Sequence, residues 1–135
     1  MTDRYAAPYI NFQGRAREAL EFYHDILGGK LTLFAVGPDG ALKAAGPHDP
    51  IGYARLEAEG MRLLGSDGNP AWPATPGNTI AITLAGPDKE GMRKAFDALA
   101  AGGTVAMPLT EAPWGTAGWL TDKFGITWNI DIVRA

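Results

Sequence analysis

The sequence contains no cysteine among its 135 residues. This absence excludes disulfide bonds, zinc sites built from thiolates and a cysteine nucleophile. Proteins of a reducing compartment carry no structural disulfides, and we expect this protein to be cytoplasmic.

Positive charge and long apolar runs are also scarce. The chain carries 12 Lys and Arg against 15 Asp and Glu, a net charge of −3, and the basic residues form no run. Nucleic-acid-binding proteins usually present a strongly basic face, so we expect no nucleic-acid partner. No apolar run reaches the roughly 18 residues of a membrane span, and the N-terminal segment does not read as a signal peptide. We therefore expect a soluble protein with no membrane partner.

Glycine and proline are abundant instead, with 18 and 10 residues, which predicts short elements joined by many turns. Apolar residues at helical spacing predict two helices, over residues 14–29 and 87–103. A glycine pair ends each helix, Gly28–Gly29 in the first and Gly102–Gly103 in the second. The shared ending is the first sign that the two halves of the chain repeat one another.

The strands follow the same order in both halves. Strands or hairpins are expected over residues 7–12, 30–37, 52–68, 79–86, 104–110 and 118–133. Loops are expected over residues 38–50, 67–78 and 111–118, and a tight turn at Glu59–Gly60. A unit of strand, helix and three strands thus occurs twice within one domain of residues 1–135. Unit 1 is predicted at about 5–67, a linker at about 68–77 and unit 2 at about 78–133.

A βαβββ unit used twice resembles the vicinal oxygen chelate superfamily, which includes glyoxalases, bleomycin-resistance proteins and extradiol dioxygenases. The segment YINFQGRAREALEFYHDILGG is similar to that superfamily's first strand and helix, with FY at Phe22–Tyr23 and LGG at Leu27–Gly29. The segment APWGTAGWLTDKFGITWNI resembles the C-terminal motif of the PhnB-like branch, in which WG and TDxFGxxW recur. The resemblance covers nearly the whole chain.

The resemblance implies an α+β fold, in which two βαβββ units form a curled mixed sheet, or cup, with the helices on its convex side. It also implies a homodimer and a ligand on the concave side. The last strand alternates sharply between apolar and polar residues. Ile126, Trp128, Ile130 and Ile132 would pack under a helix, while Thr127, Asn129 and Asp131 would face the cup.

Enzymes of the superfamily hold a divalent metal in the cup, on ligands from the first and last strand of each unit. Those positions fall on Pro8, on Thr79 or its neighbour Asn78, on Asp67 and on Asn129. Proline cannot bind a metal, and Asp67 is the one good ligand in the set. We expect both histidines, His24 and His48, to be surface residues. No metal site and no cofactor are therefore predicted, and a weakly held divalent metal stays the alternative.

Without a metal, the cup needs aromatic and polar side chains to bind a ligand. The candidate ligand-binding residues are Phe12, Asp67, Trp72, Glu111, Trp114, Asn129 and Asp131. Trp72 and Trp114 lie in predicted loops, where they either stack on a ligand or cover the edge of the core, whereas Trp128 is expected in the core. Glu111 and Asp67 are candidate acid–base catalysts, and Asp67 has the alternative role of capping a turn with its side chain.

These residues predict a small-molecule-binding protein of the glyoxalase/bleomycin-resistance type, with a degenerate cup and no metal. The alternative is a glyoxalase-like lyase or isomerase that uses Glu111 and Asp67 or a weakly held metal. The PhnB-like branch also carries methyltransferase-like and phosphonate-associated labels. The sequence supports neither label, because it has no dinucleotide-type glycine motif for a methyl donor and no basic cluster for a phosphonate.

Overall fold

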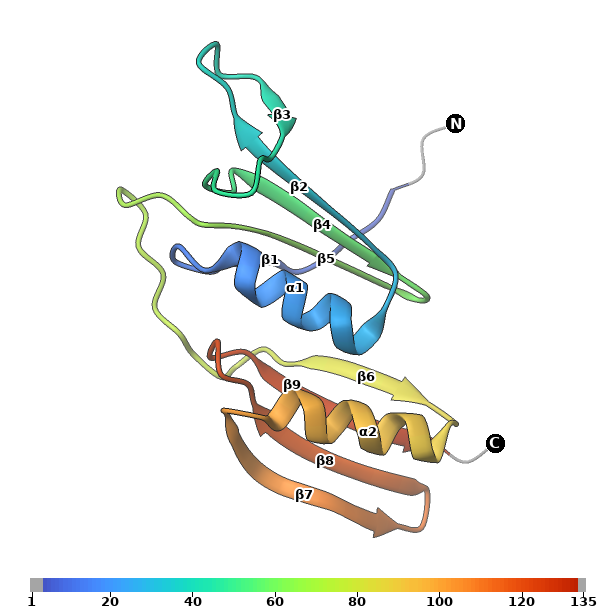
Figure 1. Ribbon diagram of the computed structural model, residues 1–135. Helices are drawn as coiled ribbons and strands as arrows, with labels where there is room; N and C mark the ends of the chain where they lie inside the picture. Colours follow the sequence, from blue (N-terminus) through green and yellow to red (C-terminus); the bar gives the residue numbers. More distant parts are fainter. Residues whose placement is uncertain (1–3, 134–135) are drawn as a thin grey trace. The chain divides into compact units, whose positions relative to one another are not determined.

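The computed structural model describes residues 4–133, which divide into two compact units on either side of the bond between Ala74 and Thr75 (Figure 1). Each unit has its own sheet and its own helix. The division falls inside the proline-rich segment that the sequence predicts as a linker. That the two units form one domain stays a prediction.

Unit 1 is a five-stranded mixed sheet with one helix on a face (Figure 1). Its elements are β1 (Tyr9–Asn11), α1 (Ala16–Leu27), β2 (Lys30–Val36), β3 (Leu42–Ala44), β4 (Tyr53–Ala58) and β5 (Met61–Ser66). The strand order is β1-β5-β4-β2-β3, and β1 runs parallel to β5 while the other pairs are antiparallel. The apolar stripe of α1 is fully buried at Ala19, Leu20 and Tyr23, and Leu56 and Leu63 of the sheet are fully buried as well.

Unit 2 repeats this arrangement with four strands. Its elements are β6 (Ile82–Gly86), α2 (Lys89–Ala100), β7 (Thr104–Ala112), β8 (Gly115–Thr121) and β9 (Thr127–Val133). The strand order is β6-β9-β8-β7, with β6 parallel to β9. Met92, Phe96 and Leu99 of α2 are buried, as are Trp128 and Ile130 of β9. In both units the first strand therefore pairs with the last, and the predicted α+β fold with two such units is confirmed.

Two predicted loops are wrong in part. Residues 42–44, predicted as loop, form the edge strand β3, because a turn at Gly37–Ala41 folds the chain back onto β2. The Asp39 carboxylate holds this turn by accepting the Ala41 N–H at 3.1 Å. Residues 111–118 form the end of β7, a turn and the start of β8, with Ala112 paired to Gly115. Strand pairing outweighs the turn-like composition that favours a loop at both places.

The glycine pairs do more than end the helices. Gly28 and Gly102 have positive φ angles of 74° and 77°, as expected of glycines that follow a helix. A side chain on the second glycine of each pair would collide with the backbone of a strand, at Glu57 for Gly29 and at Thr121 for Gly103. In both units, therefore, the first glycine of the pair ends the helix, and the second lets the chain pass close to the backbone of the sheet.

None of the helices within residues 4–133 is long and apolar enough to cross a membrane.

Candidate functional site

Each sheet has one face against its helix and one face that we call the open face. Side chains on neighbouring strands at paired positions point to the same face, so the strand register assigns each residue to one of them. In unit 2, Trp128, Ile130 and Ile132 lie on the helix face with exposures of 5% or less. Asn129 and Asp131 alternate with them and lie on the open face, so the predicted alternation is confirmed for these five residues.

Asn129 is held firmly in the open face of unit 2. Only 7% of the residue is exposed, and its amide nitrogen donates to the Gly118 carbonyl at 3.2 Å. Its amide oxygen accepts from the Thr83 hydroxyl of β6 at 3.3 Å. An amide has two donors and two acceptor lone pairs, so each of its polar atoms keeps one further position for a partner.

Asp131 and Trp119 complete this part of the open face. The cross-strand neighbours of Asp131 are Ala85 and Ala117, whose small side chains leave the half-buried carboxylate room on both sides. Trp119 is the cross-strand neighbour of Asn129 and is 39% exposed. Sequence reasoning missed Trp119, although its place in the alternation of β8 would have identified it.

The open face of unit 1 is aromatic. The rings of Tyr9 and Tyr53 stack at 6.5 Å between centroids, with 28° between their planes. Phe34 lies against Tyr53 at 6.0 Å, so three strands contribute to one row of rings. Tyr9 is 55% exposed. None of these three rings was predicted as a site residue, because the short strand β1 and the ends of β2 and β4 show little alternation.

Arg55 lies beside this row on the same face of β4. Its Nε donates to Glu57 Oε1 at 3.0 Å, and Arg62 Nε lies 3.5 Å from the other oxygen of the same carboxylate. Partial burial lowers the pKa of Arg55, but a hydrogen bond to Tyr53 and the negative charge of Glu57 outweigh it, and the pKa is raised. The guanidinium is therefore a fixed positive charge next to the aromatic rings.

Asp67 is engaged by the backbone of unit 1. Its Oδ1 accepts the N–H of Ala16, the first residue of α1, at 2.9 Å, and its Oδ2 accepts the N–H of Ile51 at 2.7 Å. The capping role that the sequence left open for Asp67 is thus present, with the helix rather than a local turn as its target. A carboxylate at a helix N-terminus is also favoured by the helix dipole.

Phe12 is a core residue of unit 1. It is 6% exposed, its ring centroid lies 6.2 Å from that of Tyr23 on α1, and a side chain at Gly65 would collide with it. These contacts place the ring on the helix face of the sheet. A ligand-binding role would require the open face, so this placement does not support the prediction for Phe12.

Glu111 lies on the helix face of unit 2, opposite Asn129 and Asp131. Its register partner is Thr116, and its carboxylate lies 3.9 Å from the ammonium of Lys89 at the start of α2. The side chain is 78% exposed and borders a cleft of about 440 Å³. Glu111 and the polar residues of β9 therefore do not share one site within this unit.

The two loop tryptophans are exposed. Trp72 is 77% exposed at the end of a turn that begins at Asn69, and its carbonyl accepts from the side chain of Asn11 at 3.3 Å. Trp114 is 54% exposed in the turn between β7 and β8. Neither ring is used by the core of its unit, so both stay candidates for contact with a ligand.

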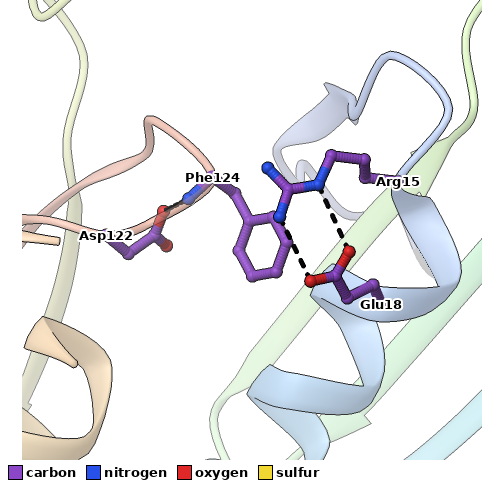
Figure 2. Close-up of polar contacts among 4 residues, drawn as sticks. All are labelled: Arg15, Glu18, Asp122 and Phe124. Atoms are coloured by element: carbon purple, nitrogen blue, oxygen red, sulfur yellow. Dashed lines mark hydrogen bonds and ion pairs between the residues drawn. The ribbon is translucent and has the colours of Figure 1, made fainter. Parts of the chain in front are cut away.

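The TDxFGxxW motif is built around Asp122, which is 3% exposed. Its Oδ1 accepts the N–H of Phe124 at 2.8 Å (Figure 2) and that of Ile126 at 3.1 Å. Its Oδ2 accepts from the indole N–H of Trp128 at 2.9 Å. The motif therefore holds the turn between β8 and β9 and fixes the largest side chain of the unit 2 core.

The first turn of α1 carries an ion pair, in which Arg15 Nη2 lies 3.1 Å from Glu18 Oε2 (Figure 2). The next arginine, Arg17, donates to the carbonyls of Gly46 and Asp49 at 2.6 and 3.1 Å. These bonds hold the loop that carries His48 against α1, beside a cleft of about 530 Å³. His48 is exposed there, on the helix side of unit 1.

The residues at the family's metal positions do not form a donor set for a divalent cation. Pro8 precedes β1, whose open-face residues are Tyr9 and Asn11, so the position assigned to the first ligand lies one residue before that face. Asp67 uses both oxygens on backbone N–H groups, and Asn129 supplies only a neutral amide. Within the described range, no group of three or more His, Asp or Glu side chains is placed to hold a metal ion.

The other histidine, His24, lies near the C-terminal end of α1. The His24 ring nitrogen Nε2 lies 3.0 Å from the carbonyl of Gly29, just beyond the end of α1. This contact closes the end of the helix and leaves no role for His24 on the open face.

Comparison with known proteins gives one family. The family model described as 3-demethylubiquinone-9 3-methyltransferase matches residues 5–131. Protein YjdN of Escherichia coli (strain K12) is 30% identical over 140 residues, which cover 95% of each chain. The crystal structure of protein PA1353 from Pseudomonas aeruginosa is 34% identical, covers 98% of this chain and 100% of its own, and has a TM-score of 0.83.

Other solved structures agree in fold. A structure from Bacillus cereus, described as a putative 3-demethylubiquinone-9 3-methyltransferase and PhnB protein, has 22% identity and a TM-score of 0.72, with 95% and 98% of the two chains covered. Solved glyoxalase/bleomycin-resistance and fosfomycin-resistance proteins share the fold at lower identity. The predicted resemblance to the vicinal oxygen chelate superfamily and its PhnB-like branch is confirmed at the level of the fold.

Proposed function

The chain belongs to the family described as 3-demethylubiquinone-9 3-methyltransferase and shares the fold of glyoxalase/bleomycin-resistance proteins, and from that premise we propose that it binds a small molecule on the open faces of its sheets. One observation carries the proposal. The open faces hold exposed or half-buried rings and hydrogen-bonding side chains, whereas the helix faces hold the buried cores. Apolar and aromatic surface with a few placed polar groups is the usual composition of a small-molecule site.

In unit 2 the binding surface consists of Trp119, Asn129 and Asp131. The exposed indole of Trp119 supplies a stacking surface, and Asn129 supplies a donor and an acceptor that are fixed by Gly118 and Thr83. Asp131 adds a carboxylate flanked by alanines. This surface binds its ligand by stacking and hydrogen bonds and requires no metal.

The alternative function is a lyase or isomerase that uses Glu111 and Asp67 or a weakly held divalent metal, and the positions of these two carboxylates do not support it. Asp67 already accepts two backbone N–H groups, and Glu111 lies on the helix face of its sheet. Methyl transfer, named in the family description, would require a site for a methyl donor. We place that reaction outside the proposal because the chain has no dinucleotide-type glycine motif.

A homodimer is part of the proposal and rests on the superfamily resemblance. Sedimentation at micromolar concentration tests it directly, with a dimer expected. A monomer under those conditions would remove this part and leave the binding surfaces as they are.

The binding proposal is tested by screening a fragment library with backbone and side-chain NMR of the labelled protein. We expect the largest shifts at Trp119, Asn129 and Asp131. Asp131→Ala should weaken the fragments that produce those shifts, because it removes the charged hydrogen-bond acceptor of the surface.

Asp97→Ala is the matched control, since it removes the same charge from an exposed position of α2. Fragments that collect only in the cleft beside Glu111 and Lys89, or equal effects of the two substitutions, would contradict the proposal.

A further inference from the structure

The open face of unit 1 carries a concentration of positive charge that the sequence does not reveal. The strand register places three basic side chains on this face. Lys30 and Arg62 both pair with Glu57, and Arg55 pairs with Thr32 and Leu64. Glu57 is the one carboxylate among these positions, so three positive side chains stand against one negative one. The net charge of the whole chain is −3, and this face therefore has the opposite sign to the protein.

The arginines keep donors beyond their shared carboxylate. Glu57 engages Arg55 and Arg62 through the Nε of each, at 3.0 and 3.5 Å. A guanidinium has five N–H donors in a planar fork, so the contact with Glu57 uses a small part of that capacity. Arg62 also lies over the ring of Tyr5, 4.0 Å from its centroid. A hollow of about 460 Å³ is lined by Tyr5, Glu57 and Arg62.

The aromatic row gives the same face a preference for flat molecules. The ring centroid of Tyr53 lies 6.5 Å from that of Tyr9 and 6.0 Å from that of Phe34, and the ring planes differ by 28° and 30°. Tyr9 remains 55% exposed at the end of the row. An offset stack on an exposed ring favours planar ligands over puckered ones.

From these contacts we propose that the open face of unit 1 selects a small planar anion of the aromatic-acid class, stacked on the tyrosine rings with its anionic group on Arg55. This inference rests on the proposed function and names the ligand class of one of its two surfaces. The open face of unit 2 carries Asp131 and is not basic, so the preference is specific to unit 1. The fixed charge of Arg55 supplies the anion site, and the Tyr9–Tyr53 pair supplies the stacking site.

Three probes separate charge from shape: benzoate, which is planar and anionic, benzamide, which is planar and neutral, and cyclohexanecarboxylate, which is anionic and puckered. Dissociation constants are measured by NMR titration at neutral pH. Benzoate is expected to bind about tenfold more tightly than either of the others, because each control lacks one of the two interactions. Equal affinity of benzoate and benzamide overturns the proposal, and so does equal affinity of benzoate and cyclohexanecarboxylate.

Substitutions then assign the two interactions to residues. Arg55→Met should weaken benzoate about tenfold and leave benzamide unchanged. Arg93→Met on the exposed side of α2 is the control for the loss of one positive charge and should change neither. An equal loss in both variants means that benzoate responds to net charge alone, which overturns the proposal.

Tyr9→Leu keeps every charge and should abolish the preference for benzoate over cyclohexanecarboxylate, so the test survives even where Arg55→Met destabilises the fold. A retained preference in this variant contradicts the stacking site. Fragments that bind the open faces without a preference for planar anions overturn this inference and leave the proposed function standing. A chain that binds no fragment on either open face overturns the proposed function itself.

Discussion

The helices of the two units begin with different partners for their first backbone N–H groups. In unit 2 the cap is local, since the Asp88 side chain accepts the N–H of Gly91 at 3.1 Å. In unit 1 the residue before the helix, Arg15, makes no side-chain cap, and Asp67 accepts the N–H of Ala16 from 51 residues away. The same carboxylate also holds Ile51, so it ties together the helix, the loop before β4 and the end of β5. A local cap stabilises one helix, whereas the distant cap at Asp67 holds three separate segments of unit 1 together.

Unit 2 contains a buried carboxylate, Asp122, with a comparable structural role. Asp122 holds the last turn and the indole of Trp128, as Asp67 holds the helix and loop of unit 1. Both aspartates look like catalytic candidates by residue type, and both are engaged by N–H groups of their own unit. Besides the exposed Trp72 and Trp114, the residues left for a ligand are therefore those of the open faces, which are aromatic and basic in unit 1 and hydrogen-bonding in unit 2.

The largest expected effect is the loss of the Trp128 side chain. Trp128→Ala should lower the free energy of unfolding by roughly 3–5 kcal/mol, because it empties a fully buried site and removes a partner of Asp122. Chemical denaturation measures the effect. Trp114→Ala is the control and should stay within about 0.5 kcal/mol, since that ring is 54% exposed. Equal effects of the two substitutions would show that β9 is not packed as described.

The two helix caps should differ in a direct comparison. Asp67→Ala is expected to cost about 2 kcal/mol of unfolding free energy, because two backbone N–H groups lose a charged acceptor. Asp88→Ala should cost about 1 kcal/mol, the usual value for a local cap. An Asp67→Ala protein that is fully stable but no longer binds ligand would reverse the assignment and return Asp67 to the site.

Asn129→Leu should fold and lose about 1 kcal/mol, while its ligand affinity falls, because the hydrogen bonds with Thr83 and Gly118 are lost along with the ligand contact. Thr83→Val is the control, since it removes one of these bonds and leaves the amide in place. Thermal unfolding and the fragment titration measure the two effects separately. A severe loss of stability without the expected loss of affinity would make Asn129 a structural residue only.

The smallest effect is expected at Glu111. Its contact with Lys89 joins two exposed side chains at 3.9 Å, and such pairs contribute at most about 1 kcal/mol. Glu111→Gln should leave both the unfolding transition and ligand binding nearly unchanged. A strong loss of ligand affinity would bring the helix face of unit 2 into the site and break the distinction between the two faces.

The two helices, most of the strands and their repeat could be predicted from the sequence, because apolar spacing and glycine pairs are local signals. The edge strand β3 and the turn between β7 and β8 could not, because strand pairing decides them. The alternation of Trp128, Asn129 and Ile130 also assigned the two faces of β9 correctly. The register between strands could not be predicted in this way. It decides that Glu111 and Asn129 lie on opposite faces, and that Trp119 lies beside Asn129.

Long-range contacts account for the remaining differences. Asp67 reads as a turn residue or a site carboxylate until the fold brings α1 to it. The basic face of unit 1 arises from residues on three strands, Lys30, Arg55 and Arg62, which are not neighbours in the sequence. Residue type alone identifies candidate chemistry, and pairing between distant segments decides which candidates remain for a ligand.

We propose that the open faces, and not the carboxylates of the helix faces, bind the ligand. A crystal structure of the protein with its best-binding fragment distinguishes between the two. We predict density against the Tyr9–Tyr53 rings or against Trp119 and Asn129. Density confined to the cleft beside Glu111 and Lys89, or to the cleft beside His48 and Asp67, would contradict the claim.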